Sequence, residues 1–135
     1  MEKQKKVLDA SVIVKEFSNE IDTDKTIRLI KSHINNEISI IVPELLFIEV
    51  LNAFRFKNKD IEAIKKINSD LEGFQFEVQK ITKSLLDKSI EISINNNLTI
   101  YDSIYVALAQ FNGCPLITSD KALYKIPNVI PLEKA

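Results

Sequence analysis

The stretch Ile38-Ser39-Ile40-Ile41-Val42-Pro43 decides the fold of this 135-residue chain. Four of its first five residues are apolar and β-branched, and a short continuous run of this kind is typical of a strand buried in a parallel sheet. Pro43 is predicted to end the strand and to open a helix, because proline is tolerated in the first helical turn. Since a buried parallel sheet needs helices on both faces, the predicted fold class is α/β.

On both sides of this stretch, short apolar runs alternate with longer helical periods. The helix over 101–111 has the clearest pattern, and the helix over 84–95 is predicted to turn Leu85, Ser89 and Ile92 to one face. No internal repeat is present, so we expect one domain over residues 1–135 with a mainly parallel central sheet. Besides 38–42, the predicted strands are 7–8, 74–78, 115–118 and 129–130, and the predicted helices are 10–17, 23–35, 44–57, 59–71, 84–95 and 101–111.

Composition narrows the class of protein. With 18 basic and 19 acidic residues, the chain is not held on nucleic acid by bulk charge. Lys3, Lys5 and Lys6 form a local basic cluster, which we interpret as a solvated tail. No apolar run reaches the roughly 18 residues of a membrane span, and no signal peptide is recognisable, so the expected location is the cytoplasm, away from membranes.

Three residue types are too scarce for common kinds of site. The single Cys114 and the single His33 cannot form an internal disulfide or a zinc site, and both are predicted to be structural. Gly73 and Gly113 are the only glycines, so no glycine-rich phosphate loop can form.

Two acidic residues directly follow predicted strands. Asp9 comes after the first strand, and Asp120 comes just after Leu116-Ile117-Thr118. Because ligands gather at the carboxyl ends of parallel strands, we expect both carboxylates at the same sheet edge. Each also has a local explanation, since either could cap a following helical turn.

Glu49 and Asp102 are predicted to join them from helices that begin or dock at that edge. Thr99-x-x-Asp102 can be interpreted as a capping box. Glu49 shares a mostly apolar helix face with Leu45, Leu46, Ala53 and Phe56, where a carboxylate is costly unless it is paired or bound to metal. The chain has only two arginines to pair with it. Four clustered carboxylates would demand a cation, and Mg²⁺ and Mn²⁺ suit such oxygen ligands.

Four segments, in order and with their spacing, resemble the motifs of PIN domains, particularly those of VapC-type toxins. They are Val7-Leu8-Asp9-Ala10-Ser11, residues 43–53 with Glu49 and Asn52, residues 98–109 with Asp102, and residues 116–123 with Thr118 and Asp120. One departure is Ser103, where the family often has Ala.

The resemblance implies a three-layer α/β/α sandwich and an endoribonuclease that needs Mg²⁺ or Mn²⁺. Asp9, Glu49, Asp102 and Asp120 would hold the metal and orient the attacking water, while Ser11, Asn52 and Thr118 would position the site. It also implies a homodimer, an RNA substrate and a VapB-type antitoxin. An antitoxin helix could lie in a groove between helices 23–35 and 44–71, with Phe47, Phe54 and Phe56 candidates for its lining.

Three other functions are weighed against this one. A phosphatase with an aspartyl nucleophile at Asp9 would place a second Asp two residues later, where this chain has Ser11. A catalytically inactive PIN-like scaffold that only binds a partner would be favoured by a missing carboxylate; none is missing, and this function stays an alternative. A housekeeping RNA-processing nuclease without an antitoxin stays open, because the motifs do not identify the RNA that is cut.

Overall fold

The computed structural model, which describes residues 2–58 and 60–135, is organised around one sheet of five strands. Every strand pair in it is parallel, and the spatial order is β3-β2-β1-β4-β5. The predicted α/β class with a parallel sheet is therefore confirmed. The strands are β1 (Gln4–Leu8), β2 (Ile38–Pro43), β3 (Glu77–Gln79), β4 (Leu116–Thr118) and β5 (Val129–Pro131).

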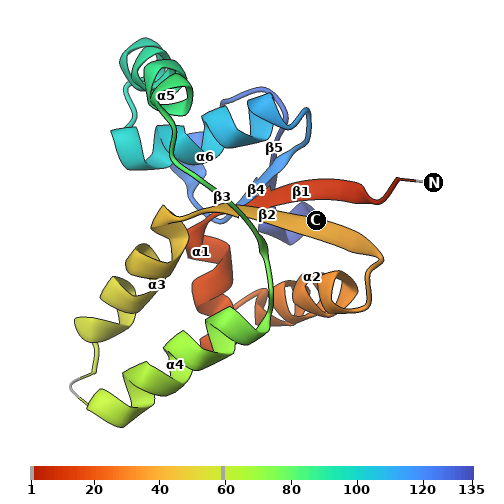
Figure 1. Cartoon of the computed structure of the whole chain (residues 1–135), viewed down its shortest axis with the longest axis vertical. Coiled ribbons are helices and arrows are strands. Elements are labelled where there is room, and N and C mark those ends of the chain that lie inside the picture. Colours follow the sequence, from red (N-terminus) through yellow and green to blue (C-terminus); the bar gives the residue numbers. More distant parts are fainter. Residues whose placement is uncertain (1, 59) are drawn as a thin grey trace.

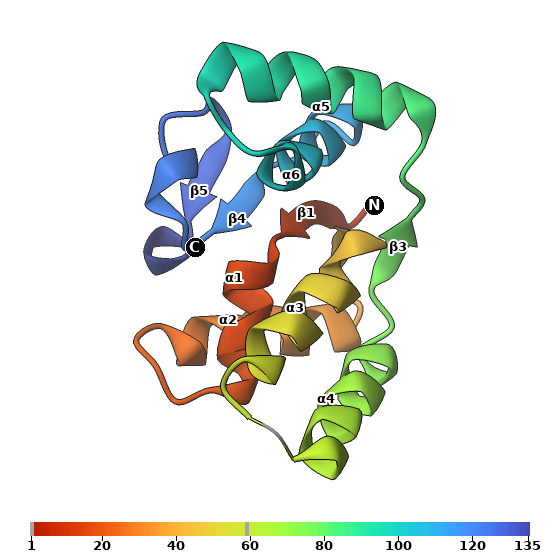
Figure 2. The same ribbon diagram turned by 90° about the vertical axis from the view of Figure 1, so that its left-hand side faces the viewer.

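Helices cover both faces of the sheet, as Figures 1 and 2 show: α5 and α6 lie on one face, and α1 to α4 lie on the other. Across residues 2–58 and 60–135, no helix combines the length and apolar character that crossing a membrane requires. The helices are α1 (Ala10–Ile13), α2 (Thr23–Ile34), α3 (Leu45–Arg55), α4 (Ile61–Gly73), α5 (Lys83–Asn96) and α6 (Ile100–Phe111), with short 3₁₀ helices η1 (Val14–Phe17), η2 (Lys121–Leu123) and η3 (Leu132–Lys134).

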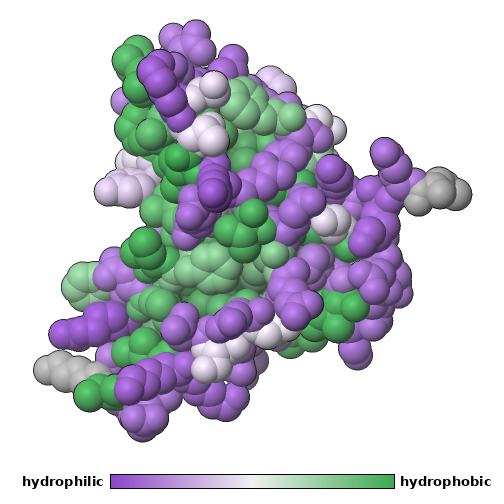
Figure 3. Space-filling model, in the orientation of Figure 1, coloured by the Kyte–Doolittle hydropathy of each residue, from purple (hydrophilic) through white to green (hydrophobic). Residues whose placement is uncertain are grey.

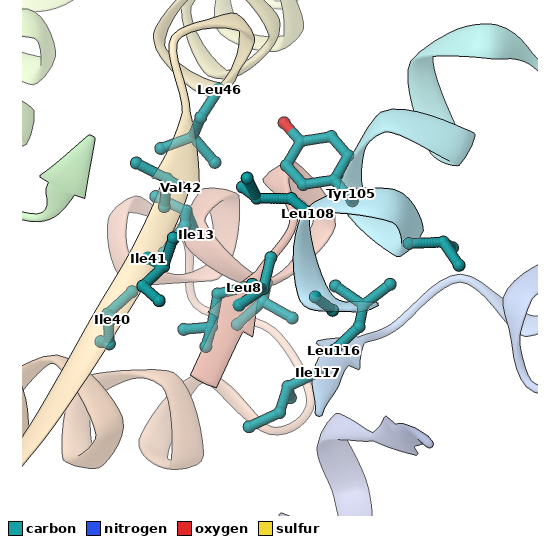
Figure 4. Packing of buried hydrophobic residues seen from close by; sticks show 14 of the residues in the cluster. Leu8, Ile13, Ile40, Ile41, Val42, Leu46, Tyr105, Leu108, Leu116 and Ile117 are labelled. Atoms are coloured by element: carbon teal, nitrogen blue, oxygen red, sulfur yellow. The ribbon is translucent and has the colours of Figure 1, made fainter. Parts of the chain in front are cut away.

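The core lies where β1, β2 and β4 meet the inner faces of the helices. Figure 4 shows Leu8, Ile41 and Ile117 from these strands in the same hydrophobic cluster as Leu46 of α3 and Leu108 of α6. All five side chains are at most 2% exposed. The predicted face of α5 is confirmed, because Leu85, Ser89 and Ile92 are its buried residues. Burial of this apolar surface is the main stabilising contribution to the fold.

Several element boundaries differ from the sequence prediction. Pro43 stays inside β2, and α3 begins only at Leu45. The predicted helix 59–71 starts at Lys59, a residue outside the described part of the chain; the observed α4 begins after Asp60, whose carboxylate accepts hydrogen bonds from the first turn. The helix also continues past its predicted end at residue 71 to Gly73, and the left-handed residue that follows is Gln75, at φ 53°. The strand predicted at 74–78 consequently begins later, at Glu77.

The N-terminal lysines also differ from their predicted state. Lys5 and Lys6 belong to β1 and pair with Ser39 and Ile40 of β2, so their backbone is not a solvated tail. The side chain of Lys5 is exposed, and that of Lys6 is partly buried. The short prediction of Val7-Leu8 failed to include these residues because lysine is not typical of strands.

His33 connects three elements through its ring. Its Nδ1 accepts a hydrogen bond from the N–H of Ile40 at 3.0 Å, and its Nε2 lies 2.9 Å from the carbonyl oxygen of Gln75. Strand β3 pairs with β2 only from Ile41 onward, so on this side of β2 the imidazole takes the place of a strand partner for the N–H of Ile40. The prediction that His33 is structural is confirmed by this geometry.

We expect His33→Ala to lower the free energy of unfolding by about 1–3 kcal/mol, because it leaves the N–H of the fully buried Ile40 without an acceptor. Urea denaturation followed by circular dichroism measures the change. Lys31→Gln, at an exposed position on the same helix, is the control and should stay within about 0.5 kcal/mol of the wild type. An equally stable His33→Ala variant would contradict the assignment.

Candidate active site

The strand order creates a switch point between β1 and β4. From β1 the chain proceeds to β2 and β3 on one side, whereas β4 is followed by β5 on the other side. In open parallel sheets, the crevice at such a point, beyond the carboxyl ends of the strands, is where ligands bind. Asp9 follows β1, and Asp120 follows β4 by two residues, so the switch point brings two predicted site residues to one edge.

Asp9 is the most buried carboxylate of this edge, with 5% of its surface exposed. Its Oδ1 accepts hydrogen bonds from the Ser11 hydroxyl at 2.6 Å and from the N–H of Val12 at 3.3 Å, and its Oδ2 accepts one from the Thr118 hydroxyl. Burial raises the pKa of Asp9 to about 6; the charge of Asp102 also raises it, and the hydrogen bonds from Ser11, Thr118 and Val12 lower it. The predicted capping of α1 by Asp9 is confirmed by the bond from Val12.

Ser11 and Thr118 join the start of α1 to the end of β4. The Ser11 Oγ accepts a hydrogen bond from the N–H of Ser119, and the Thr118 Oγ1 accepts one from the N–H of Asp120, both at 3.0 Å. The two hydroxyl oxygens lie 3.4 Å apart. Ser11 and Thr118, which the sequence predicted as positioning groups, therefore contact Asp9 directly. Both also accept hydrogen bonds from the loop that carries Asp120.

Glu49 lies on α3 at the margin of the buried helix face. The fully buried residues of this helix are Leu46 and Val50, whereas Phe56 is 82% exposed. The predicted apolar stripe through Glu49 and Phe56 is therefore wrong, because the helix turns that stripe partly to solvent. The Glu49 Oε1 nevertheless has a partner, the hydroxyl of Tyr105, which donates a hydrogen bond at 2.6 Å. Burial raises the pKa of Glu49, the charge of Asp102 raises it further, and the Tyr105 bond lowers it.

Asp102 and Asp120 are both partly buried, and both take part in helix caps. The Thr99 hydroxyl caps α6 by accepting a hydrogen bond from the N–H of Asp102 at 3.1 Å. The Asp120 carboxylate caps η2 by accepting one from the N–H of Ala122 at 3.0 Å. Burial raises the pKa of Asp102 most, and the negative charge of Asp120 raises it further.

The four carboxylates thus influence one another, and the protein does not neutralise them. Asp102 raises the pKa of both Asp9 and Glu49, and Asp120 raises that of Asp102. Within residues 2–58 and 60–135, the salt bridges are three pairs on helix surfaces, and none includes these four acids. The hydrogen bonds that the carboxylates of Asp9, Glu49 and Asp120 accept all come from neutral hydroxyls or backbone N–H groups.

The chemistry of these four side chains fits a hard divalent cation. Each would offer carboxylate oxygens, the ligands that Mg²⁺ and Mn²⁺ prefer. In the described part of the chain, no three acidic, His or Cys side chains are close enough together to form a ready-made metal cage. This spacing is compatible with Mg²⁺, which usually keeps several waters and takes one or two carboxylates directly.

Two residues stand apart from the sequence prediction. Asn52 is exposed on α3, and its side chain makes no hydrogen bond to the residues that the structure describes, so it is not brought into the cluster. Tyr105 lies in the helix predicted over 101–111 and was not among the predicted site residues, although its hydroxyl donates a hydrogen bond to Glu49. The one available signal was that a buried tyrosine usually needs a partner for its hydroxyl.

Comparison with known proteins places this geometry in context. The PIN domain family profile matches residues 6–129. Among solved structures, the chain is similar to PAE2754 from Pyrobaculum aerophilum, at 24% identity and a TM-score of 0.71 over 98% of this chain and 93% of the other. It is also similar to VapC20 from Mycobacterium tuberculosis, a toxin that cleaves the sarcin-ricin loop, at 11% identity and a TM-score of 0.73 over 92% and 96%.

A further similar structure is VapBC2 from Rickettsia felis, bound to a DNA fragment from its promoter, at 16% identity and a TM-score of 0.70 over 95% and 97% of the two chains. No curated protein sequence gives a significant match. At these identities, the structural likeness establishes the PIN-like fold.

We expect the unfolding free energy of the metal-free protein to fall as the pH rises from about 4 to 7. The folded pKa of Asp9 is raised to about 6 from 3.8, so the folded state holds a proton that the unfolded state loses in this window. The loss attributable to Asp9 is about 3 kcal/mol, since one pKa unit corresponds to about 1.4 kcal/mol.

Denaturation at pH 4 and pH 7 measures this difference, which should shrink in Asp9→Asn because asparagine keeps the cap without a charge. Asp87→Asn, on the surface of α5, should leave it unchanged. If Asp9→Asn retains the full pH dependence of stability, the burial of the Asp9 carboxyl is not its cause.

Proposed function

This chain belongs to the PIN domain family, and from that premise we propose that it is an endoribonuclease that hydrolyses RNA phosphodiester bonds with Mg²⁺ or Mn²⁺. The observation that carries the proposal is the set of Asp9, Glu49, Asp102 and Asp120, held at the switch point by neutral donors alone. Such a set retains its negative charge for a cation, and a cation can in turn bind the phosphate of RNA.

In this proposal the four carboxylates hold the cation, and the hydroxyls fix the carboxylates. When bound, the cation neutralises charge on the phosphate and lowers the pKa of water. Ser11 and Thr118 orient both oxygens of Asp9, so that this carboxylate keeps one direction. The exposed amide of Asn52, one helical turn beyond Glu49, would contact the substrate at the rim of the site. Water adds to phosphorus and the 3′-oxygen leaves, which yields a 5′-phosphate and a 3′-hydroxyl.

The biological role we propose is that of the toxin in a VapBC-type pair. Its support is that solved structures with this fold include a toxin–antitoxin complex from Klebsiella pneumoniae and a DNA-bound VapBC from Salmonella typhimurium. An antitoxin would need an apolar surface, and α3 and α4 offer Ile48, Phe56 and Ile61, each at least 67% exposed. Phe54 is not available for it, because its ring packs edge-to-face against Phe17 at 5.9 Å.

A homodimer is part of the same proposal. The outer surface of α5 exposes Leu86, Ile90 and Ile94, which lie one turn apart along one stripe of the helix. Figure 3 shows apolar side chains gathered on that flank of the molecule, around α5. A second copy of the chain that packed its α5 there would cover the stripe on both partners.

From this proposal we first predict the binding of the cation alone, because a binding measurement needs no knowledge of the RNA. We expect calorimetry to detect Mn²⁺ binding to the wild type and a loss of at least about tenfold in affinity, 1.4 kcal/mol, for Asp9→Asn and for Asp102→Asn. Asp87→Asn on α5 is the matched control and should bind Mn²⁺ like the wild type. If the wild type binds no Mn²⁺, the titration is repeated with an uncleavable oligonucleotide, and failure there too would sink the proposal.

The second prediction concerns the reaction. Incubated with an RNA library and Mg²⁺, the wild type should produce fragments with 5′-phosphates, which sequencing of ligated products identifies. A chelator should stop the cleavage, and Asp120→Asn should lower the rate by at least about a hundredfold if the carboxylate is part of the catalytic set. Cleavage that persists in the chelator, or in Asp120→Asn at the wild-type rate, would exclude the proposed chemistry.

A further inference from the structure

Tyr105 combines two environments in one side chain. Its ring is 1% exposed and belongs to the hydrophobic core, where Figure 4 shows it beside Leu108. Its hydroxyl leaves that core and donates a hydrogen bond of 2.6 Å to the Oε1 of Glu49. The ring is therefore immobilised by packing, and the position of its oxygen is fixed with it.

The bond joins the two helical layers of the fold. Tyr105 lies on α6, whereas Glu49 lies on α3, on the opposite face of the sheet (Figure 1). Around Glu49, α3 is open to solvent: Ile48 is 68% exposed, and Asn52 is exposed one turn later. Among residues 2–58 and 60–135, the Tyr105 hydroxyl is the only hydrogen-bond donor to the Glu49 carboxylate. Without it, no hydrogen bond from the described residues selects one rotamer of the long Glu49 side chain.

We propose that Tyr105 is a positioning residue that anchors Glu49 by its Oε1 and leaves the Oε2 free for the divalent cation. This inference rests on the proposed function, since it assigns a role toward the cation of that same site. It adds a fifth side chain to the four carboxylates, and one that was not among the site residues expected from the sequence.

A neutral anchor suits this position better than a charged one. A lysine or arginine would hold Glu49 more strongly, but it would cancel the charge that attracts the cation. The phenol also lies near Asp9 and Asp102, whose negative charges act on it together with that of Glu49. A hydroxyl can orient a carboxylate in such surroundings without lowering the net negative charge of the site.

The competing explanation is that Glu49 merely satisfies the hydroxyl of a buried tyrosine. Tyr105→Phe separates the two roles, because it removes only the oxygen and keeps the ring in the core. If Tyr105 positions Glu49, the variant should bind Mn²⁺ about tenfold more weakly while remaining folded, which is the low end of the effect expected for groups that orient metal ligands. Tyr101→Phe, one turn earlier on α6 and 59% exposed, is the matched control and should bind like the wild type.

A double-mutant cycle tests whether the effect passes through Glu49. In a Glu49→Gln background, Tyr105→Phe should cause no further loss of Mn²⁺ affinity, because the anchored carboxylate is already gone. Equal losses in both backgrounds would overturn the inference, and so would wild-type affinity in Tyr105→Phe. Calorimetry is run under the condition, with or without oligonucleotide, in which the wild type binds.

A spectroscopic readout does not depend on affinity or activity. The chain has three tyrosines and no tryptophan, so Tyr101→Phe/Tyr124→Phe leaves Tyr105 as its only fluorophore of these two kinds. Addition of Mg²⁺ should change the tyrosine fluorescence of this variant, and Glu49→Gln added to it should abolish the change. If the tyrosine fluorescence of this variant does not change at saturating Mg²⁺, the proposed role of Tyr105 is overturned.

The outcomes for the two proposals are distinct. If the wild type neither binds Mn²⁺ nor cleaves RNA, the proposed function and the role of Tyr105 fall together. If the wild type does both and Tyr105→Phe behaves like it, only the role of Tyr105 is overturned.

Discussion

The constraint on which the rest of the structure depends is the mutual repulsion of four carboxylates at one sheet edge. The protein could relieve it with lysine or arginine, yet the donors that reach these acids are hydroxyls and backbone N–H groups. Keeping such a cluster folded requires a rigid frame, since each acid is pulled toward solvent and away from its neighbours. The buried strands β1 and β4 supply that frame on either side of the switch point.

Much of this arrangement could be predicted from the sequence, because a parallel sheet converts chain order into spatial position. Asp9 and Asp120 each follow an apolar run, and strands that run in one direction deliver such residues to the same edge. The capping explanation and the site explanation of these acids were treated as alternatives, but the structure shows that they are compatible. The Oδ1 of Asp9 caps α1 while its Oδ2 accepts from Thr118. A carboxylate has enough lone pairs for both.

What escaped prediction depends on contacts between segments that no local pattern connects. Glu49 and Tyr105 are 56 positions apart, and the helical pattern over 101–111 gives no direction for the Tyr105 hydroxyl. The apolar helix face predicted around Glu49 was also wrong, since the stripe that includes Phe56 faces solvent. The start of β3 shifted for a similar reason: the left-handed turn falls on Gln75, and a sequence reading favours the nearby Gly73 for it.

The hydrogen bond between Asp9 and Thr118 spans 109 positions of the chain, and this separation has a consequence for synthesis on the ribosome. The first carboxylate emerges early, but β1 lacks its neighbour β4 until the polypeptide has been extended past Thr118. A nascent or prematurely terminated chain therefore carries Asp9 without the Thr118 hydroxyl, one of the two hydroxyls that orient it. Under the proposed function, late assembly of this kind would keep incomplete chains from cleaving the RNA of the ribosomes that make them.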